Sequence, residues 1–477
     1  MLTLVNANTM TPPIAPVGLD YIAGAAKKAG IQVDIVDLCL TDNPDTLLQS
    51  YFASHNPDLA GISFRNVDDC FWPSAQWFVP QLVDTVNKIR NLTDASVVLG
   101  GVGFSIFGRR IVEYAGADFG ILGDGEQAMI CLLKELQGAK YFENVDGLIW
   151  RKGEVFCSNR PAWPRQLSLP TERNSVDNKT YFKLGGQGGI ETKRGCNRHC
   201  IYCADPLAKG AALRLRKPAE VADEVENLLS QGIDVLHLCD GEFNIPGHHA
   251  YRVCEEFIRR RFGQRLRWYT YMSIVPFDKE LAAAMKRAGC VGIDFTTDSA
   301  SPVMLKTYGQ RYLPKDIAFA VRLCKENGVT VMLDLLLGGP GETPETAAET
   351  ISFIKEIGPD CAGAPLGVRI YPGTKIAQIV AAEGDLEKNP NIRRNYEGEV
   401  DFFKPTFYIS SLLGDRPARL VKDLIDGDRR FFEPMEESAA ADKTDHNYNA
   451  NMELAEAIRK GARGAYWDIL RRIKIKA

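Results

Sequence analysis

Three cysteines within one short loop are the residues of this sequence best suited to chemistry. Cys196, Cys200 and Cys203 follow the spacing Cys-x3-Cys-x2-Cys, and an aromatic residue, Tyr202, precedes the last of them. Three thiolates this close can ligate three irons of a cubic [4Fe-4S] cluster, which normally takes four cysteines. No fourth cysteine follows nearby in the sequence. The loop therefore predicts a cluster with one iron left open to a ligand that is not protein.

Two simpler uses of these cysteines fit their spacing less well. A structural zinc site takes four ligands, usually in two close pairs of Cys or His, and His199 inside the loop does not complete such a pattern. Buried structural thiols are common, but three of them in a polar loop that begins with a glycine would make a poor core. The cluster is the favoured interpretation.

The elements around the loop predict the scaffold that positions it. Six strands separated by helices are expected in the region 186–385, at Gly189–Thr192, Val235–Leu238, Arg267–Tyr271, Val291–Phe295, Val331–Leu337 and Gly363–Ile370. Repeated strand–helix units form parallel sheets, and six of them predict a partial (β/α)6 barrel. In parallel barrels the chemistry lies at the carboxyl ends of the strands. The cysteine loop follows the first strand at that end.

Polar residues follow several later strands of this barrel. Asp240, Gly241 and Glu242 come after the second strand, where an acid and exposed backbone carbonyls can bind an ammonium group. Further candidates are Asp294, Thr296 and Ser299 on the fourth strand, Gly339 after the fifth and Arg369 at the sixth. An arginine can grip a carboxylate with two hydrogen bonds. The same residue types also cap helices or form structural ion pairs, so both uses stay open.

The N-terminal region, 1–140, alternates strands and helices in the same way. Strands are expected at Leu2–Val5, Gln32–Val36, Leu59–Phe64, Ser96–Leu99 and Phe119–Leu122, with an amphipathic helix over Val17–Ala29. This alternation predicts an α/β domain with a parallel sheet covered on both faces. Ligands of such flavodoxin-like or Rossmann-like sheets bind outside the carboxyl ends of the strands.

Those carboxyl ends are rich in glycine. Glycine lets the backbone approach a large flat ligand closely. The candidate ligand-binding residues at the strand ends are Pro13, Gly18, Ser63, Arg65, Gly100, Gly101, Gly103, Gly123, Gly125 and Glu126. A single turn of this kind is weak evidence, but the turns recur after four strands of one sheet.

Together these motifs resemble class B of the radical S-adenosylmethionine (SAM) superfamily, in which a cobalamin-binding domain precedes the radical barrel. The resemblance rests on the cysteine spacing with Tyr202, on Pro12, Pro13, Gly18 and Leu19, and on the run Gly123-Asp-Gly-Glu126. It implies a [4Fe-4S] cluster on the three cysteines and SAM at the barrel residues named above. It also implies cobalamin at the glycine-rich strand ends and Tyr202 against the cluster or the adenine.

One motif of the classical corrinoid proteins is missing. They carry Asp-x-His-x-x-Gly, whose histidine ligates cobalt, and this sequence has no such run. The only histidine in the first 190 residues is His55, which precedes the third strand and so lies on the wrong side of the sheet. Bound cobalamin is therefore expected to lack a histidine ligand.

The resemblance implies a methyltransferase that uses two molecules of SAM. One SAM would methylate cobalamin, and the other would yield a 5′-deoxyadenosyl radical that abstracts hydrogen from an unactivated carbon, which then takes the methyl group from methylcobalamin. A lipid, a natural product or a peptide could be the substrate, and an external flavodoxin-type or ferredoxin-type donor would supply electrons. Two alternatives remain. The protein could rearrange or cyclise its substrate without methylation, or it could be a corrinoid or metal carrier without turnover.

Bulk composition agrees with an ordinary soluble, cytoplasmic enzyme. The 477 residues carry a net charge of −4, with 45% hydrophobic and 25% charged residues. An acidic balance argues against a nucleic-acid partner, and no apolar run is long enough for a membrane span or a signal peptide. The other cysteines are scattered singly, as buried reduced thiols usually are.

The remaining segments connect and cover the two predicted domains. Residues 141–185 are expected to form a linker that contains a β-hairpin over 147–157 and then a proline-rich connector. Residues 386–477 are expected to form a mostly helical cap that shapes the substrate pocket, with a helix over Met452–Ile473 weakened by Gly461 and Gly464. The basic end of that helix leaves a peripheral membrane contact open, although its own dipole also favours basic residues there.

Overall fold

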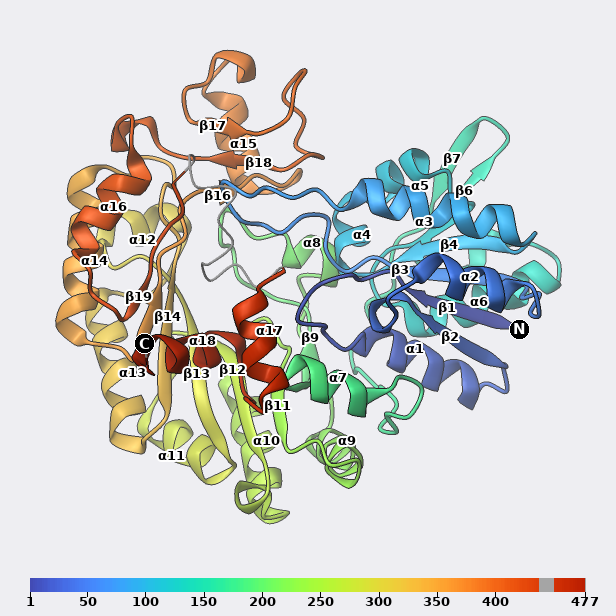
Figure 1. The fold of residues 1–477 in the computed structure, drawn as a ribbon, viewed down its shortest axis with the longest axis horizontal. Coiled ribbons are helices and arrows are strands. Elements are labelled where there is room, and N and C mark those ends of the chain that lie inside the picture. The colour runs from blue at the N-terminus through green and yellow to red at the C-terminus, as the bar shows by residue number, and fades with distance from the viewer. Residues whose placement is uncertain (437–449, 477) are drawn as a thin grey trace.

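Two parallel sheets lie side by side in this protein. The structure is a computed structural model that describes residues 1–436 and 450–476. In Figure 1 the N-terminal sheet, blue to cyan, lies at the right, and the second sheet, yellow to orange, lies at the left. Loops from the carboxyl ends of both sheets line one shared cavity.

The N-terminal sheet has the strand order β2-β1-β3-β4-β5-β6-β7. Its strands are β1 (Leu2–Asn6), β2 (Val33–Asp37), β3 (Leu59–Ser63), β4 (Ser96–Gly100), β5 (Phe119–Ile121), β6 (Leu148–Lys152) and β7 (Val155–Ser158). The first five strands are parallel and have the flavodoxin-like order 2-1-3-4-5. The prediction of a flavodoxin-like domain is confirmed.

Helices cover both faces of this sheet because its strands alternate two apolar sides. One face packs on α1 (Val17–Lys28) and α6 (Gly125–Gln137), and the other on α2 (Pro44–Phe52), α3 (Val79–Leu92) and α5 (Arg109–Ala115). Leu4 and Val98 belong to the first layer, whereas their neighbours Val5 and Val97 belong to the second. Buried strands with this period of two fix the register of the sheet.

The predicted hairpin belongs to the first sheet. Strand β6 pairs antiparallel with β5, so that Leu148 lies opposite Ile121, and β7 pairs with β6. The N-terminal sheet therefore reaches residue 158, beyond the boundary expected at 140. The proline-rich connector then leads to α7 (Asn178–Gly185) and into the second sheet.

The second sheet is an open barrel with the order β19-β15-β14-β13-β12-β11-β8. Its strands are β8 (Gly188–Ile190), β11 (Val235–Leu238), β12 (Arg267–Ser273), β13 (Cys290–Asp298), β14 (Thr330–Leu335), β15 (Cys361–Gly363) and β19 (Phe431–Phe432), all parallel. The main helices between them are α9 (Pro218–Ser230), α10 (Gly247–Arg259), α11 (Lys279–Arg287), α12 (Pro302–Tyr308), α13 (Pro314–Asn327) and α14 (Pro344–Ile357). The six predicted strands are present, and β19 adds a seventh.

The expected sixth strand is interrupted. It divides into β15 and β16 (Val368–Arg369), with Pro365 and Gly367 between them. Proline has no N–H for the ladder, and Gly367 has a φ of +102°, which takes the chain out of the extended conformation. Strand β16 then joins β17 (Ile392–Arg394) and β18 (Thr406–Tyr408) in a separate small sheet.

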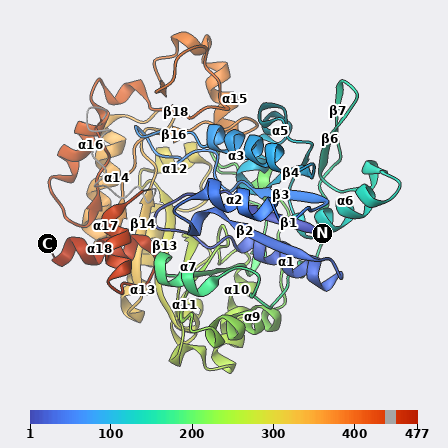
Figure 2. The same ribbon diagram turned by 45° about the vertical axis from the view of Figure 1, so that its right-hand side comes forward.

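The C-terminal helices close the inside of the barrel. The expected helix over Met452–Ile473 is two helices, α17 (Met452–Arg459) and α18 (Tyr466–Lys476), because Gly461 and Gly464 have φ values of +100° and +139°. Figures 1 and 2 show both helices, in red, across the yellow strands. Trp467 and Leu470 of α18 pack on inward side chains of the strands, among them Tyr269 and Met332.

The basic end of α18 is tied to the protein. Arg471 pairs with Asp468, Arg472 donates to the carbonyl of Arg463, and Lys474 donates to the carbonyl of Phe431. These contacts give the three basic side chains an internal role. Within the described residues, no helix is long and apolar enough to cross a membrane.

The scattered cysteines are free thiols. Cys254, Cys290, Cys324 and Cys361 are buried, as expected, whereas Cys70 and Cys239 are exposed. Both exposed thiols line the shared cavity.

Candidate active site

The three-cysteine loop is held at its base by a short antiparallel ribbon. Strand β9 (Lys193–Arg194) precedes the loop, β10 (Arg214–Leu215) follows it, and the two pair. The amide of Cys196 donates to the carbonyl of Gly210 at 3.1 Å. Gly195 has a φ of +85°, and a Cβ there would lie 2.1 Å from the carbonyl oxygen of Ala212. Only glycine fits this entry to the loop.

The three thiols lie close together and are suited to a positively charged metal cluster. Burial raises the pKa of Cys200 to about 12, and the charge of Asp298 acts in the same direction. Burial also raises the pKa of Cys203, with the charges of Asp205, Cys200 and Cys196 adding to it. Nearby thiolates in a buried place need a metal to hold them ionised. Three soft sulfur donors and no fourth cysteine in the loop fit an open [4Fe-4S] cluster.

Polar residues surround the thiols at the carboxyl end of the barrel. Gln310 donates from Nε2 to the sulfur of Cys200 at 3.4 Å and also to Asp298. Tyr202, the aromatic residue of the motif, donates to Asp298 at 2.7 Å and meets Tyr308 edge to face. Asp298 therefore links the cysteine loop to the end of β13.

Glu242 has one free carboxylate oxygen in this region. Its Oε1 accepts from Thr296 at 2.9 Å, whereas its Oε2 is buried with no hydrogen-bond partner in the described structure. Burial raises the pKa of Glu242 to about 8. A buried acceptor without a donor fits the ammonium group of SAM, as expected for the turn after the second strand.

Three predicted ligand residues have partners within the protein. Asp240 accepts hydrogen bonds from Thr192 and Lys193, so its carboxylate shapes the entry to the cysteine loop. The other two are Arg369, which pairs with Asp68 at 2.9 Å, and Ser299, which bonds to Thr350 at 2.8 Å.

These contacts favour the structural uses left open for Arg369 and Ser299 and give the Asp240 carboxylate internal donors, while the binding roles expected for the three residues stay predictions. Arg369 is 4% exposed, and its remaining donors are used by backbone carbonyls. Ser299 is fully buried, and its hydroxyl also accepts from the amide of Ser301 at the start of α12. Gly339 packs against the ring of Tyr308, where a Cβ would lie 2.2 Å from the hydroxyl.

A cavity of about 850 Å³ opens between the two sheets. Every residue predicted for the glycine-rich strand ends lines it: Pro13, Gly18, Ser63, Arg65, Gly100, Gly101, Gly103, Gly123, Gly125 and Glu126. From the barrel side, Asp240 and Gly241 also line it. The sequence prediction thus brings these residues together on one surface.

This surface fits a large flat cofactor. A Cβ at Gly18 would meet no atom within 4 Å, and a Cβ at Gly100 would meet only the carbonyl oxygen of Ile121, at 3.9 Å. The missing side chains leave a cradle that cobalamin would fill. His55 lies away from it, stacked on Tyr51 before β3, so the N-terminal sheet presents no histidine to the cavity.

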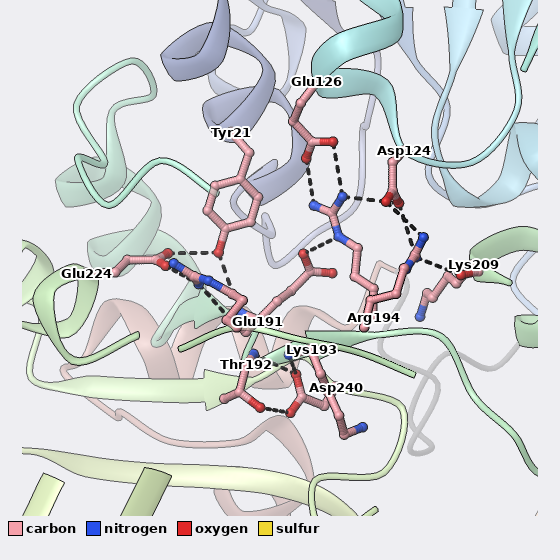
Figure 3. Close-up of polar contacts among 12 residues, drawn as sticks. Tyr21, Asp124, Glu126, Glu191, Thr192, Lys193, Arg194, Lys209, Glu224 and Asp240 are labelled. Carbon is pink, nitrogen blue, oxygen red and sulfur yellow. Dashed lines mark hydrogen bonds and ion pairs between the residues drawn. The ribbon is translucent and has the colours of Figure 1, made fainter. Parts of the chain in front are cut away.

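Charged residues join the two domains beside the cavity, as Figure 3 shows. Arg194 bonds to Glu126 at 2.8 and 3.1 Å and to Glu191 at 2.8 Å. Arg214 bonds to Asp124 at 2.9 Å. Glu126 and Asp124 belong to the glycine-rich turn after β5, and the arginines flank the cysteine loop, so this network links the two predicted cofactor sites.

A second, fully buried network lies next to the first. Arg173 of the connector pairs with Asp20 at 2.6 Å and with Glu224 at 2.7 Å. Tyr21 donates to the same Glu224 at 2.8 Å, and the guanidinium group of Arg173 lies 5.1 Å from its ring centre. The connector is thereby fixed to both domains.

Sequence reasoning missed several cavity residues of the barrel. The missed residues are His237, Tyr271, Asp334, Tyr371, Tyr466 and Trp467. Period-two alternation along β11, β12 and β14 could have placed the first three inside the barrel. No local signal connects Tyr466 and Trp467 to it, because they come from the far end of the chain.

Comparisons with known proteins agree with this geometry. Residues 3–133 match the B12 binding domain, and residues 190–354 match the radical SAM superfamily. The tryptophan 2-C-methyltransferase of Streptomyces laurentii is 29% identical over 98% of this chain and 95% of its own length. The cytidylyl-2-hydroxyethylphosphonate methyltransferase of Streptomyces wedmorensis is 24% identical over 72% of this chain and 73% of its own length.

A solved structure matches along the whole chain. The radical SAM methyltransferase TsrM from Kitasatospora setae, with tryptophan substrate and a SAM analogue bound, is 30% identical, with a TM-score of 0.90 over 100% of this chain and 98% of that one. TsrM has also been solved with cobalamin and a [4Fe-4S] cluster. Together with the two domain matches, this relationship shows that the protein belongs to the cobalamin-dependent radical SAM methyltransferases, which use a [4Fe-4S] cluster, SAM and cobalamin.

Proposed function

We propose that the protein transfers a methyl group from SAM to an indole carbon of tryptophan or a close tryptophan derivative. The observation that carries this proposal is the cavity between the two domains. Its barrel end is lined by aromatic side chains: Phe71, Tyr271, Tyr371, Tyr466 and Trp467. Aromatic walls with a few placed polar groups are typical of sites for flat aromatic ligands. The likeness to enzymes described as acting on tryptophan supports the same substrate class.

The chain's own residues would hold the reactants in fixed places. When bound, the cluster supplies an electron for cleavage of SAM, and cobalamin carries the methyl group. Gln310 holds the sulfur of Cys200, and Thr296 orients the carboxylate of Glu242 toward the ammonium group of SAM. The glycine-rich strand ends would hold cobalamin against the same cavity. Substrate between these sites would be shielded from water by both domains.

We assign one binding role to each segment of the chain. Residues 1–158 would bind cobalamin, 186–385 would bind the cluster and SAM, and 386–477 would shape the substrate pocket through α18. An external donor of the flavodoxin or ferredoxin type would supply electrons, and the free thiols support a reducing, cytoplasmic setting.

Anaerobic turnover with labelled SAM tests the proposal. The protein, reconstituted with iron, sulfide and hydroxocobalamin, would be given SAM with a trideuterated methyl group, a reductant and L-tryptophan. We expect tryptophan that carries the labelled methyl group on the indole, S-adenosylhomocysteine from the SAM that gives its methyl group, and 5′-deoxyadenosine with methionine from the SAM that is cleaved. Cys200→Ala should abolish the labelled tryptophan and the 5′-deoxyadenosine, and Cys157→Ala, a change of a thiol in the β-hairpin, should leave both unchanged.

Other outcomes would overturn the proposal in distinct ways. SAM consumption with an unlabelled, rearranged product would indicate a radical enzyme that does not methylate. Retained cobalamin without any SAM consumption would favour a carrier. Labelling of other aromatic compounds, but not of tryptophan, would reject the indole substrate.

A further inference from the structure

Two acids on neighbouring strands lie at the inner end of the cavity: Asp334 lines it, and Asp294 is its diagonal neighbour in the register. Successive residues of a strand alternate between the two faces of a sheet. Tyr271 of β12 lies beside Asp294 of β13, and Thr296 lies beside Asp334 of β14. Asp334 and Tyr271 line the cavity, and the Tyr271 ring is 40% exposed within it. The barrel interior is therefore open to a ligand at this level.

Neither acid forms an ion pair with a side chain that the structure describes. Asp294 is 3% exposed, and its Oδ1 has no hydrogen-bond partner in the described structure. The charges of Asp334 and Glu242 add to burial in raising the pKa of Asp294. A buried carboxylate without a partner costs free energy until a donor or a cation reaches it. A cationic ligand at this position would stabilise both carboxylates.

A third side chain beside the cavity, that of Trp467, has a hydrogen-bond donor without an acceptor in the described structure. Trp467 of α18 lines the cavity and is 2% exposed, and its indole N–H has no acceptor within the described residues. The ring meets Tyr269 edge to face, and a Cβ at Gly292 would lie 3.1 Å from it. Trp467 thus forms the floor of the barrel and presents a donor without an acceptor.

Metal ions and SAM do not account for these groups. In the described ranges, Asp294 and Asp334 belong to no group of three His, Cys, Asp or Glu side chains that could hold a single metal ion. The residues suited to SAM, Glu242 and Thr296, lie further toward the carboxyl ends, near Asp298 and the cysteine loop. Asp294 precedes Thr296 by two positions on the same strand, one layer deeper in the barrel, whereas Asp334 lies level with Thr296 on the neighbouring strand.

A zwitterionic amino acid would satisfy all three groups at once. We propose that Asp294 and Asp334 bind the ammonium group of the substrate and that the Trp467 N–H donates to its carboxylate. The assignment rests on the proposed function, since it takes the substrate to be an amino acid with an aromatic side chain. It places the amino-acid end at the barrel floor and leaves the indole to reach toward the cofactors.

Binding of three ligands to the reconstituted holoenzyme tests this assignment without turnover. The ligands are L-tryptophan, tryptamine, which lacks the carboxylate, and indole-3-propionate, which lacks the amino group. Affinities would be measured by calorimetry under anaerobic conditions without reductant. The wild-type protein should bind L-tryptophan at least about tenfold more tightly than either analogue, because each analogue leaves a charged hydrogen bond unmade.

Two variants should show opposite selectivity. Asp334→Asn should weaken the binding of L-tryptophan and of tryptamine by about tenfold and leave the affinity for indole-3-propionate unchanged. Trp467→Phe keeps an aromatic ring but removes the N–H donor. It should therefore weaken the binding of L-tryptophan and of indole-3-propionate and leave the affinity for tryptamine unchanged. Asp415→Asn, a change of an exposed acid, should alter none of the affinities. The visible spectrum of bound cobalamin would check that each variant remains folded.

The possible failures can be told apart. If L-tryptophan and indole-3-propionate bind equally to the wild-type protein, or if both variants weaken all three ligands alike, the subsite assignment is wrong while the proposed function stands. If no indole ligand binds, the proposed substrate class is wrong, and the assignment falls with it.

Discussion

Arg194 and Glu126 form a two-pronged ion pair across the domain boundary, with Nη2–Oε1 and Nη1–Oε2 distances of 2.8 and 3.1 Å. Although burial raises the pKa of Glu126, Arg194 holds it below its ordinary value. Arg194 stands two residues before Cys196, the first cysteine of the loop. The pair therefore ties the turn after β5 to the entry of the cysteine loop.

Arg194→Ala should destabilise the protein by about 3–5 kcal/mol, because it leaves buried carboxylates without their cation. It should also reduce the cobalamin retained after reconstitution. Denaturant unfolding and the visible spectrum measure the two effects. The matched control is Arg265→Ala, which breaks a two-pronged pair with Glu226 on the surface and should cost no more than about 1 kcal/mol. Equal losses in both variants would contradict the anchoring role.

The cofactor surfaces were predictable because each depends on a local signal. The spacing of the three cysteines is read directly from the sequence, and strand–turn alternation places every glycine-rich end on one edge of a parallel sheet. Strand segments that recur between helices also predicted the six barrel strands. These features need only neighbouring residues and the rule that parallel strands share their carboxyl edge.

Long-range pairing could not be predicted in the same way. The sequence left both a ligand and a structural ion pair open for Arg369, because its partner, Asp68, is about 300 positions away in the other domain. Trp467 enters the barrel only because Gly461 and Gly464 turn the C-terminal helix inward. Single-residue chemistry does not tell which of several acids at the strand ends has a partner. The sequence therefore did not separate Asp240, which accepts hydrogen bonds from Thr192 and Lys193, from Asp294, whose Oδ1 has no partner in the described structure.

Gln310→Leu should lower the reduction potential of the cluster. The amide of Gln310 donates to the sulfur of Cys200 at 3.4 Å, and hydrogen bonds to cluster sulfurs favour the reduced, more negative state. Gln310→Glu replaces the amide donor with a carboxylate, so it should lower the reduction potential of the cluster at least as much as Gln310→Leu does. Anaerobic redox titration followed by electron paramagnetic resonance measures the shift. An unchanged potential in both variants, with full iron content, would rule out this role for Gln310.

Gly363→Ala should displace the carboxylate of Asp334. A Cβ at Gly363 would lie 2.5 Å from Asp334 Oδ1 and 2.9 Å from the Met332 methyl group. We therefore expect weaker binding of L-tryptophan and little change for indole-3-propionate, which carries no ammonium group. Calorimetry with the two ligands checks the difference. Equal weakening of both would mean that the substitution disturbs the barrel as a whole.

The stability of the ligand-free protein should fall as pH rises across the titration of Asp334. Burial raises its pKa to about 7, whereas an aspartate in an unfolded chain titrates near about 3.9. Between these values the folded state binds more protons than the unfolded state, so the free energy of unfolding decreases with pH. The free energy of unfolding reaches its full decrease above about pH 7.

Asp334→Asn removes one titrating group from a set that interacts. Tyr271, Asp294, Glu242 and Asp298 face the same interior and remain titratable in the variant, and loss of the Asp334 charge should lower the raised pKa values of Tyr271 and Asp294. The unfolding free energy of the variant, relative to that of the wild type, should rise by about 1–3 kcal/mol between pH 5 and pH 8, because the asparagine has no charge to bury. Thermal unfolding at both pH values provides the measurement. A difference between variant and wild type that is the same at both pH values would show that folding does not raise the pKa of Asp334. Saturating L-tryptophan should cancel the difference, because its ammonium group supplies the missing counter-charge.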